Sequence, residues 1–329
     1  MVILNVTNLS IEEISKINRV VVDEISFSLK KGEVLGIVGE SGSGKTVTAM
    51  SLLNLLSDDL KISKGTINFL GTDICKASEK ELEKIRGNSF SIIFQNPISS
   101  LNPLMKVGKQ ILEVIEKHQN LDKKQMLNRT FEVLSDVGFK DNFMEIYNKY
   151  PHELSGGQGQ RIGIAMAIAN NPKIIIADEP TTALDKNTQA QILNLLKEIQ
   201  NKYQTSIILI SHDLEIIKNF TDNALIMYFG QIVESGSTYD IFLNPNHHYT
   251  KGLLDSLPEN FKKGESIKVM KGGIPNINDN IEGCFFSPRC PAAIENCKKN
   301  RIMYNFDKKN HKGIRCINPL KEKNLWKIK

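Results

Sequence analysis

The stretch Gly39-Glu40-Ser41-Gly42-Ser43-Gly44-Lys45-Thr46 decides the fold of this chain. An apolar run over residues 34–38 precedes it and is typical of a buried parallel strand, and residues 46–56 behind it have helical spacing. In that setting the pattern G-x-x-x-x-G-K-[ST] predicts a loop whose backbone N–H groups turn inward around a phosphate. An ordinary glycine turn is the alternative, and the complete pattern between a strand and a helix argues against it. The stretch therefore predicts a nucleotide site.

The loop also predicts how the nucleotide is held. Lys45 is expected to reach the β- and γ-phosphates, and the Thr46 hydroxyl is expected to take one Mg²⁺ position. The residues assigned to nucleotide binding in this loop are Gly39, Ser41, Gly42, Ser43, Gly44, Lys45 and Thr46.

Length and composition exclude several classes of protein. The 329 residues allow one large or two modest domains, and a formal charge of +5 is small for that length. No stretch approaches the roughly 18 apolar residues that span a bilayer, and residues 1–13 lack the basic start of a signal peptide. We therefore expect a cytoplasmic location, in which the five cysteines stay reduced.

Strand and helix signals alternate along the chain. Strands are expected at residues 2–9, 20–29, 65–71, 90–94, 173–177 and 206–210, and helices at 78–86, 107–117, 123–137, 141–150 and 187–202. This order predicts a doubly wound parallel sheet with its ligand at the carboxyl edge. Residues 96–150 carry helical signals and few strand signals, which indicates a helical insertion into an α/β domain.

Polar side chains stand at the ends of three expected strands. Asp178 suits a Mg²⁺ ligand, and Glu179 suits a base or water-orienting carboxylate. His212 could contact a γ-phosphate, and the Gln95 amide could ligate Mg²⁺. A helix-capping turn for the two carboxylates and a structural histidine are the alternatives. Three polar strand ends beside one phosphate loop favour a catalytic site.

The stretch Ser155-Gly156-Gly157-Gln158 opens a further helix. Ser with Gln three residues later is a capping box. A capping box does not require the two glycines. Their lack of side chains would let a phosphate approach the start of the helix closely. The residues alone leave open whose phosphate that is.

Together these motifs resemble those of an ABC ATPase. The set comprises GESGSGKT at 39–46, Gln95, LSGGQ at 154–158, IIIADE at 174–179, TALD at 182–185 and His212. The resemblance implies a P-loop ATPase domain with an antiparallel β subdomain and a helical insertion. It implies two such domains in a head-to-tail sandwich, with ATP between one P-loop and the partner's LSGGQ. It also implies that Glu179 activates water, that His212 contacts the γ-phosphate, and that the insertion with Gln95 docks a membrane subunit.

Three further stretches resemble the peptide and nickel importer branch of that family. They are FQNPISSLNP at 94–103, FLNPNHHYTKGLL at 242–254 and GCFFSPRCPAAIENC at 283–297. The resemblance implies an ATPase subunit at the cytoplasmic face of the membrane that energises import of di- or oligopeptides, with nickel or a metal complex as the alternative substrate. The implied partners are a second ATPase subunit, identical or related, two transmembrane permease subunits and, indirectly, an external substrate-binding protein.

The expected domains are an ATPase core at 1–95 and 156–257, a helical subdomain at 96–155 and a C-terminal extension at 258–329. Two features depart from the family pattern. Residues 1–26 contain no aromatic side chain or histidine that could stack on adenine. Gly159 follows LSGGQ where a larger residue is common, and a glycine there should loosen the turn by up to about 1 kcal/mol.

Four cysteines lie in the extension. Cys284, Cys290, Cys297 and Cys316 have the spacing C-x5-C-x6-C-x18-C, which matches neither the common zinc ribbons nor the ferredoxin pattern. Their spacing leaves a soft-metal site and four ordinary thiols as equal alternatives. The resemblance favours a [4Fe-4S] cluster, with zinc as the alternative.

Two rival functions have less support from the sequence. A soluble ABC ATPase acting on nucleic acid is encouraged by the basic tail at 321–329 alone, and such proteins generally carry two cassettes or a long coiled-coil insertion. An ATP-dependent regulator with a metal-sensing tail would show a metal-dependent ATPase rate. We expect no nucleic-acid partner.

Overall fold

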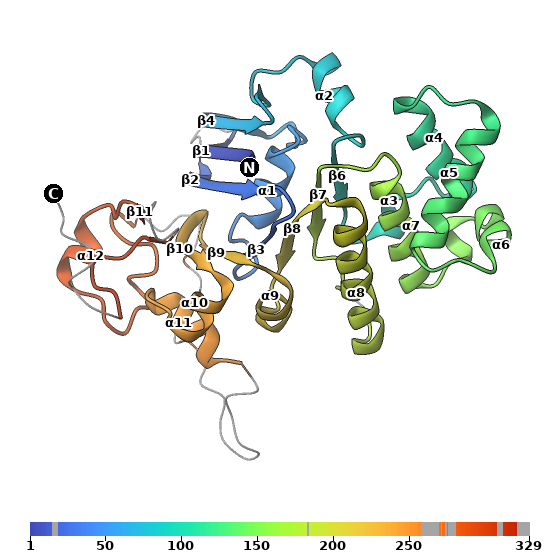
Figure 1. Ribbon diagram of the computed structural model, residues 1–329. Helices are drawn as coiled ribbons and strands as arrows, with labels where there is room; N and C mark the ends of the chain where they lie inside the picture. The colour runs from blue at the N-terminus through green and yellow to red at the C-terminus, as the bar shows by residue number, and fades with distance from the viewer. Residues whose placement is uncertain are drawn as a thin grey trace.

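Two β-sheets and the helices around them make up the computed structural model, which describes residues 1–14, 19–182, 184–257, 270, 272–273, 275, 281–307 and 312–320 (Figure 1). The strands are β1 (Val2–Glu13), β2 (Val20–Lys30), β3 (Val34–Val38), β4 (Leu60–Phe69), β5 (Thr72–Asp73), β6 (Phe90–Ile93), β7 (Ile174–Asp178), β8 (Ser206–Ser211), β9 (Asn223–Tyr228), β10 (Gln231–Ser237), β11 (Asn305–Asp307) and β12 (Lys312–Ile314). The helices are α1 (Lys45–Ser51), α2 (Glu79–Ile85), α3 (Pro97–Ser100), α4 (Val107–His118), α5 (Lys123–Asp136), α6 (Phe143–Asn148), η1 (Pro151–Glu153), α7 (Gly156–Ile168), α8 (Lys186–Tyr203), α9 (Leu214–Phe220), α10 (Thr238–Leu243), α11 (His248–Asp255) and α12 (Glu295–Lys299).

The larger sheet carries the nucleotide loop. Its strand order is β11-β12-β10-β9-β3-β8-β7-β6, and the strands from β9 to β6 run parallel. Strands β10, β12 and β11 extend it as antiparallel strands. The smaller sheet, β2-β1-β4-β5, is antiparallel throughout. The predicted parallel sheet and the predicted antiparallel subdomain are both confirmed, but the larger sheet is mixed rather than purely parallel.

The central strands are buried on both faces. In β7, Ile174 and Ile176 belong to an apolar core shared with α1 and the smaller sheet, whereas Ile175 and Ala177 belong to a second core shared with the helices of the opposite face. Successive side chains of a strand point to opposite faces, so each central strand serves both cores. This double burial explains why these strands are continuous apolar runs.

Most predicted elements are present, with shifted ends. The helix expected at residues 46–56 ends at Ser51, because the chain turns there and Asn54 takes a left-handed backbone with φ of 51°. The strand expected at 65–71 begins earlier, at Leu60, where it pairs with Glu13 at the end of β1. No helix among the described residues combines the length and apolarity that a membrane crossing requires.

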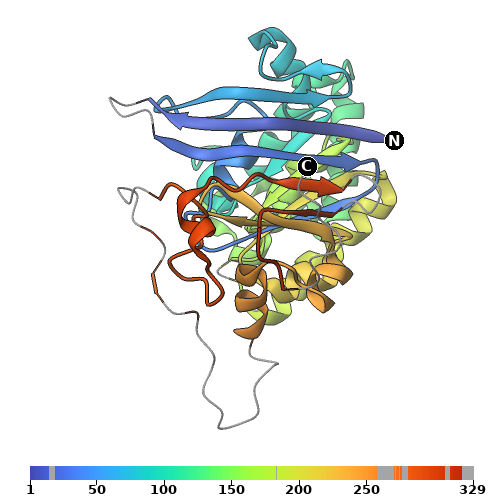
Figure 2. The same cartoon turned by 90° about the vertical axis from the view of Figure 1, so that its left-hand side faces the viewer.

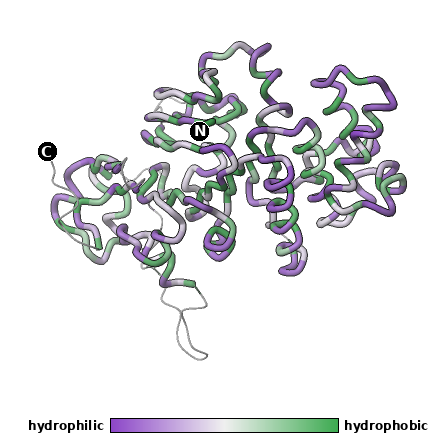
Figure 3. Tube along the Cα trace, in the orientation of Figure 1, coloured by the Kyte–Doolittle hydropathy of each residue, from purple (hydrophilic) through white to green (hydrophobic). Residues whose placement is uncertain are grey.

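Helices α4, α5 and α6 form the insertion, at the right of Figure 1. Their tube alternates between hydrophilic and hydrophobic residues, as expected of helices that cover a core with one face (Figure 3). Ile111, Ile115 and Val133 are among the fully buried residues of that face. The insertion therefore packs onto the same core that underlies α7 and α8.

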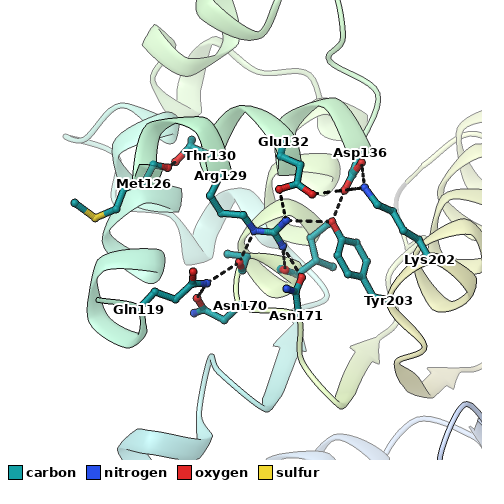
Figure 4. Close-up of polar contacts among 12 residues, drawn as sticks. Gln119, Met126, Arg129, Thr130, Glu132, Asp136, Asn170, Asn171, Lys202 and Tyr203 are labelled. Carbon is teal, nitrogen blue, oxygen red and sulfur yellow. Dashed lines mark hydrogen bonds and ion pairs between the residues drawn. The ribbon is translucent and has the colours of Figure 1, made fainter. Parts of the chain in front are cut away.

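A polar network joins the insertion to α7 and α8 (Figure 4). The guanidinium of Arg129 on α5 donates to the carbonyl oxygens of Ile168 at 3.2 Å and Ala169 at 3.0 Å, where α7 ends. It also binds Asn171 Oδ1 at 2.5 Å and Glu132 at 2.7 Å. A cation at a helix C-terminus satisfies carbonyl groups that have no partner within the helix.

The C-terminal segment, residues 281–307 and 312–320, packs against the nucleotide-binding sheet. Strand β12 pairs with β10, with Ile314 opposite Glu234, and β11 pairs with β12. In Figure 2 this segment lies directly beside the strands of the sheets. Arg315 is 3% exposed and donates to the carbonyl oxygens of Ile232 and Ile302. No strand was predicted here, and the antiparallel extension of the sheet is a finding of the structure.

Candidate functional site

The loop between β3 and α1 has the backbone that its glycines predict. Gly42 and Gly44 have φ of 77° and 94°, in the left-handed region that favours glycine. A Cβ at Gly39 would lie 2.1 Å from the carbonyl oxygen of Met227 on β9, so this position accepts no side chain. The glycines thus set both the turn of the loop and its close approach to the next strand.

Lys45 is the first residue of α1, directly after the loop. Its Nζ donates to the carbonyl oxygens of Gly39 at 2.8 Å and Glu40 at 3.0 Å. Burial lowers the pKa of the Lys45 ammonium, while the carboxylates of Glu179 and Asp178 act in the opposite direction. A buried ammonium facing two carboxylates is a site prepared for anionic ligands and a metal ion.

Asp178 ends β7 next to the start of α1. Its Oδ1 accepts a hydrogen bond of 3.4 Å from the Thr46 hydroxyl, and the residue is 3% exposed. Burial raises the pKa of the Asp178 carboxyl, while the hydrogen bond from Thr46 lowers it. Two of the three side chains that the sequence assigned to Mg²⁺, Thr46 and Asp178, are therefore neighbours, whereas the Gln95 amide contacts Glu179. Hard oxygen donors of this kind are what Mg²⁺ prefers.

Glu179 is the meeting point of the polar strand ends. Its carboxylate accepts from Gln95 Nε2 at 3.1 Å and from the Thr182 hydroxyl at 2.9 Å, and it lies 3.2 Å from His212 Nδ1. Its backbone has φ of 46° and its N–H donates to the carbonyl of Ile210. Gln95, Glu179 and His212 are thus brought together as the sequence predicts, whereas the contact from Thr182 was not predicted.

One cleft of about 810 Å³ contains these groups. Its lining includes the loop from Ser41 to Thr46, together with Gln95, Glu179, Thr182 and His212. The lining also includes Glu13, Arg19, Val21, Asp59 and Leu60. No aromatic side chain other than the His212 imidazole is among the described residues that line the cleft. Among these lining residues, Arg19 is therefore the one whose planar cation can stack on a ring.

The LSGGQ stretch does not face this cleft. Ser155 is the N-cap of α7 with the predicted capping box, in which Gln158 N–H donates to Ser155 Oγ at 3.3 Å and Ser155 N–H donates to Gln158 Oε1 at 3.1 Å. Ser155 and Gly156 are exposed, and Gly157 and Gln158 are half-buried. The helix start is thus open to a ligand that another molecule brings.

Gly159 has a packing role that the sequence did not indicate. It is buried, and a Cβ there would lie 2.4 Å from Ile98 Cγ1 on α3. The glycine therefore allows α3 and α7 to approach closely, which offsets the loosening expected from a glycine in the first turn.

The four cysteines of the C-terminal segment face one another. Cys284, Cys290, Cys297 and Cys316 line a cavity of about 20 Å³ and none is in a disulfide. Burial raises the pKa of Cys284 to about 11 and of Cys316 to about 12, and the neighbouring cysteines add to the effect. No group of three or more His, Cys, Asp or Glu side chains within the described ranges is arranged to hold a metal ion. The thiols converge, as a soft-metal site requires, but without ligand geometry.

Two family models match the chain. One, described as "ABC transporter", matches residues 22–182, and one described as "Oligopeptide/dipeptide transporter, C-terminal region" matches residues 233–297. Among solved structures, the dimeric ATP-binding cassette MJ0796 bound to ADP and Pi has a TM-score of 0.63 and 27% identity, covering 71% of this chain and 98% of that one. CbiO1 from Clostridium perfringens, part of the transporter complex CbiONQ, has a TM-score of 0.64 and 28% identity, with coverages of 74% and 91%.

Curated relatives match over nearly the whole length. The oligopeptide transport ATP-binding protein AppD of Bacillus subtilis is 43% identical over 90% of this chain and 90% of its own. The dipeptide transport ATP-binding protein DppD of Haemophilus influenzae is 44% identical over 92% of this chain and 90% of its own. The resemblance read from the motifs is confirmed. The chain is an ABC ATPase and belongs to the family of oligopeptide and dipeptide transport ATP-binding proteins.

Proposed function

We propose that this protein hydrolyses ATP to energise an importer of dipeptides or oligopeptides across the cytoplasmic membrane. The observation that carries the proposal is the cleft lined by the P-loop, Gln95, Glu179 and His212, in a chain whose residues 233–297 match the peptide transporter model. Its domains are the ATPase core at 1–95 and 156–257, the helical subdomain at 96–155 and the extension at 258–329.

The phosphate end of the cleft holds MgATP. Backbone N–H groups of the loop and the Lys45 ammonium would bind the phosphates, and Thr46, Asp178 and Gln95 would hold Mg²⁺. Bound Mg²⁺ would neutralise charge on the transferring phosphoryl group. The hydrogen bond between Thr46 and Asp178 supports this assignment, because both side chains already point to one position.

Glu179 orients the attacking water and accepts its proton, while His212 contacts the γ-phosphate. The contacts that Glu179 receives from Gln95, Thr182 and His212 support this role, because they fix the carboxylate at the mouth of the cleft. The Arg19 guanidinium takes the adenine base at the other end. A planar guanidinium stacks on aromatic rings, which compensates for the missing aromatic side chain.

A second ATPase subunit supplies LSGGQ to each cleft. The exposure of Ser155 and Gly156 on the start of α7 supports a head-to-tail sandwich, because the helix end is open to a partner's nucleotide. The helical subdomain docks one of two permease subunits at the cytoplasmic face of the membrane, and an external binding protein delivers the peptide to them.

The variant Glu179→Gln tests the hydrolytic role. It should bind MgATP with unchanged affinity, lose turnover by about a hundredfold or more, and elute as an ATP-dependent dimer in gel filtration. Glu83→Gln, on the exposed helix α2, removes a carboxylate outside the cleft and should behave as the wild type. Normal turnover by Glu179→Gln would remove Glu179 from its assigned role.

We further propose that Cys284, Cys290, Cys297 and Cys316 hold a [4Fe-4S] cluster, with zinc as the alternative. The convergence of the four thiols on one cavity supports this proposal. Anaerobic purification should give about four irons and four sulfides per chain and an absorption band near 400 nm. The double variant Cys284→Ser, Cys290→Ser should lose both the iron and the absorption band. One zinc, or no metal in the wild type, would refute the cluster.

A further inference from the structure

A side chain of the C-terminal segment reaches the P-loop. Arg289, in the turn between Cys284 and Cys290, binds the carboxylate of Glu40 through both terminal nitrogens. The distances are 2.7 Å from Nη1 to Oε2 and 3.1 Å from Nη2 to Oε1. Glu40 is the second residue of the GESGSGKT loop. This is the two-pronged arrangement in which arginine pairs with carboxylates most strongly.

The surroundings of Arg289 hold it in place. Its side chain is 6% exposed, and its guanidinium lies over the rings of Tyr228 at 5.7 Å and Phe286 at 5.9 Å. Phe286 also contacts Tyr249, with ring centroids 5.4 Å apart. A planar cation between aromatic faces keeps a defined orientation. Arg289 is therefore fixed by its packing before it meets the P-loop.

The backbone of Glu40 is held as well. Its N–H donates to the Tyr249 hydroxyl at 3.0 Å, and its carbonyl oxygen accepts from Lys45 Nζ at 3.0 Å. The contacts from Tyr249 on α11 and from Arg289 come from residues more than two hundred positions further along the chain. The P-loop conformation thus depends on parts of the chain that carry no nucleotide motif.

We infer that Arg289 is a positioning residue for the P-loop, through which the C-terminal segment sets the affinity for nucleotide. The inference rests on the proposed function. Arg289 acts in two ways: it fixes the first turn of the loop, and it neutralises a carboxylate that would otherwise stand beside the phosphates. An unpaired Glu40 would repel an anionic triphosphate.

The test compares MgATP and MgADP binding to the full-length wild type, Arg289→Gln and the matched control Arg301→Gln. Arg301 also joins the C-terminal segment to the core, with Nη2 at 2.6 Å from Asp23, but its side chain is 48% exposed and it makes no hydrogen bond or ion pair with the P-loop among the described residues. Arg289→Gln should raise the Kd of both nucleotides about tenfold and the KM for ATP equally, with kcat at saturation within about twofold. Arg301→Gln should match the wild type.

A second variant separates the charge from the fold. Glu40→Gln removes the carboxylate and should suppress most of the defect of Arg289→Gln, so that the double variant binds MgATP within about threefold of Glu40→Gln alone. Arg289→Lys keeps the charge with a single contact and should have an intermediate Kd. If Arg289→Gln does not fold, Arg289→Lys takes its place in the test. The melting temperature of each variant without nucleotide shows whether it folds.

The outcomes are separable. A Kd unchanged in Arg289→Gln, an equal loss in Arg301→Gln, or additive effects of the Arg289 and Glu40 substitutions would overturn the positioning role while leaving the ATPase function intact. A wild type that binds no MgATP would overturn the proposed function and the inference together.

Discussion

Arg19 lies at the end of the nucleotide cleft where an aromatic side chain would be expected in this family. It lies in the connection between β1 and β2, directly before β2, and its carbonyl oxygen accepts a hydrogen bond of 2.8 Å from the Glu13 N–H. That bond fixes the backbone of Arg19 beside Val21 and Leu60, which line the same end of the cleft. A base held there would contact a guanidinium plane on one side and aliphatic carbons on the other.

Arg19→Ala should therefore raise the Kd for MgATP about threefold to tenfold, because a stacking contact of roughly 1 kcal/mol is lost. Arg19→Tyr should restore binding, since an aromatic ring offers the same stacking surface. Titration with a fluorescent adenine nucleotide measures both. If Arg19→Ala and Arg19→Tyr both bind MgATP with the Kd of the wild type, Arg19 has no part in holding the base.

The sequence predicted the site residues that lie at strand ends. It did not predict the residues that contact the site from distant parts of the chain. Gln95, Glu179 and His212 were accessible because the carboxyl ends of parallel strands meet at one edge of a sheet. Arg289 and Tyr249 carried no such signal. Both lie in stretches quoted for the family resemblance, but which residue contacts Glu40 depends on tertiary packing that no local pattern encodes.

Helix α7 depends on the insertion for its C-terminal cap. The last carbonyl groups of a helix lack partners within it, and here Arg129 from α5 supplies donors to two of them. On the other side, Asp136 of α5 accepts from Lys202 of α8 at 2.6 Å and also pairs with the Tyr203 hydroxyl. The insertion and the core thus share a continuous polar contact.

Arg129→Ala should lower the free energy of unfolding by about 2–4 kcal/mol, because its side chain is 11% exposed and its removal leaves several buried acceptors unpaired. Urea denaturation measures the change. Lys149→Ala is the control: it removes a helical pair with Glu145 at 2.8 Å and should cost under about 0.5 kcal/mol. A similar cost for both variants would mean that the network contributes little.

At the level of elements, the sequence succeeded where periodicity is strong. Strands β3, β6, β7 and β8 and the helices α4, α5 and α8 were predicted from apolar runs or helical spacing, within a few residues at each end, whereas strands β9 and β10 were not predicted. The short strands β11 and β12 were missed because three residues cannot express a period, and the residues of β10 that pair with β12 lie about 80 positions earlier. Their formation depends on the edge that β10 offers.

The whole molecule includes its C-terminal segment as part of the fold. Phe286 is 2% exposed within the larger apolar core, and Arg315 is buried against β10. A chain ending at residue 257 should therefore melt at least about 5 °C lower or be insoluble, since burial of one such phenylalanine is worth about 3–5 kcal/mol. A chain ending at residue 320 keeps these contacts and is the control. Equal melting temperatures would show that the segment adds no stability.

The contact between Arg289 and Glu40 also has a consequence for biosynthesis. The P-loop leaves the ribosome early, while its partner arginine follows 249 residues later. At common elongation rates the delay is roughly 10–50 s. Throughout that interval Glu40 lacks its arginine partner. A nascent chain therefore acquires full nucleotide affinity only after Arg289 has been synthesised, which couples maturation of the ATP site to synthesis of the C-terminal segment.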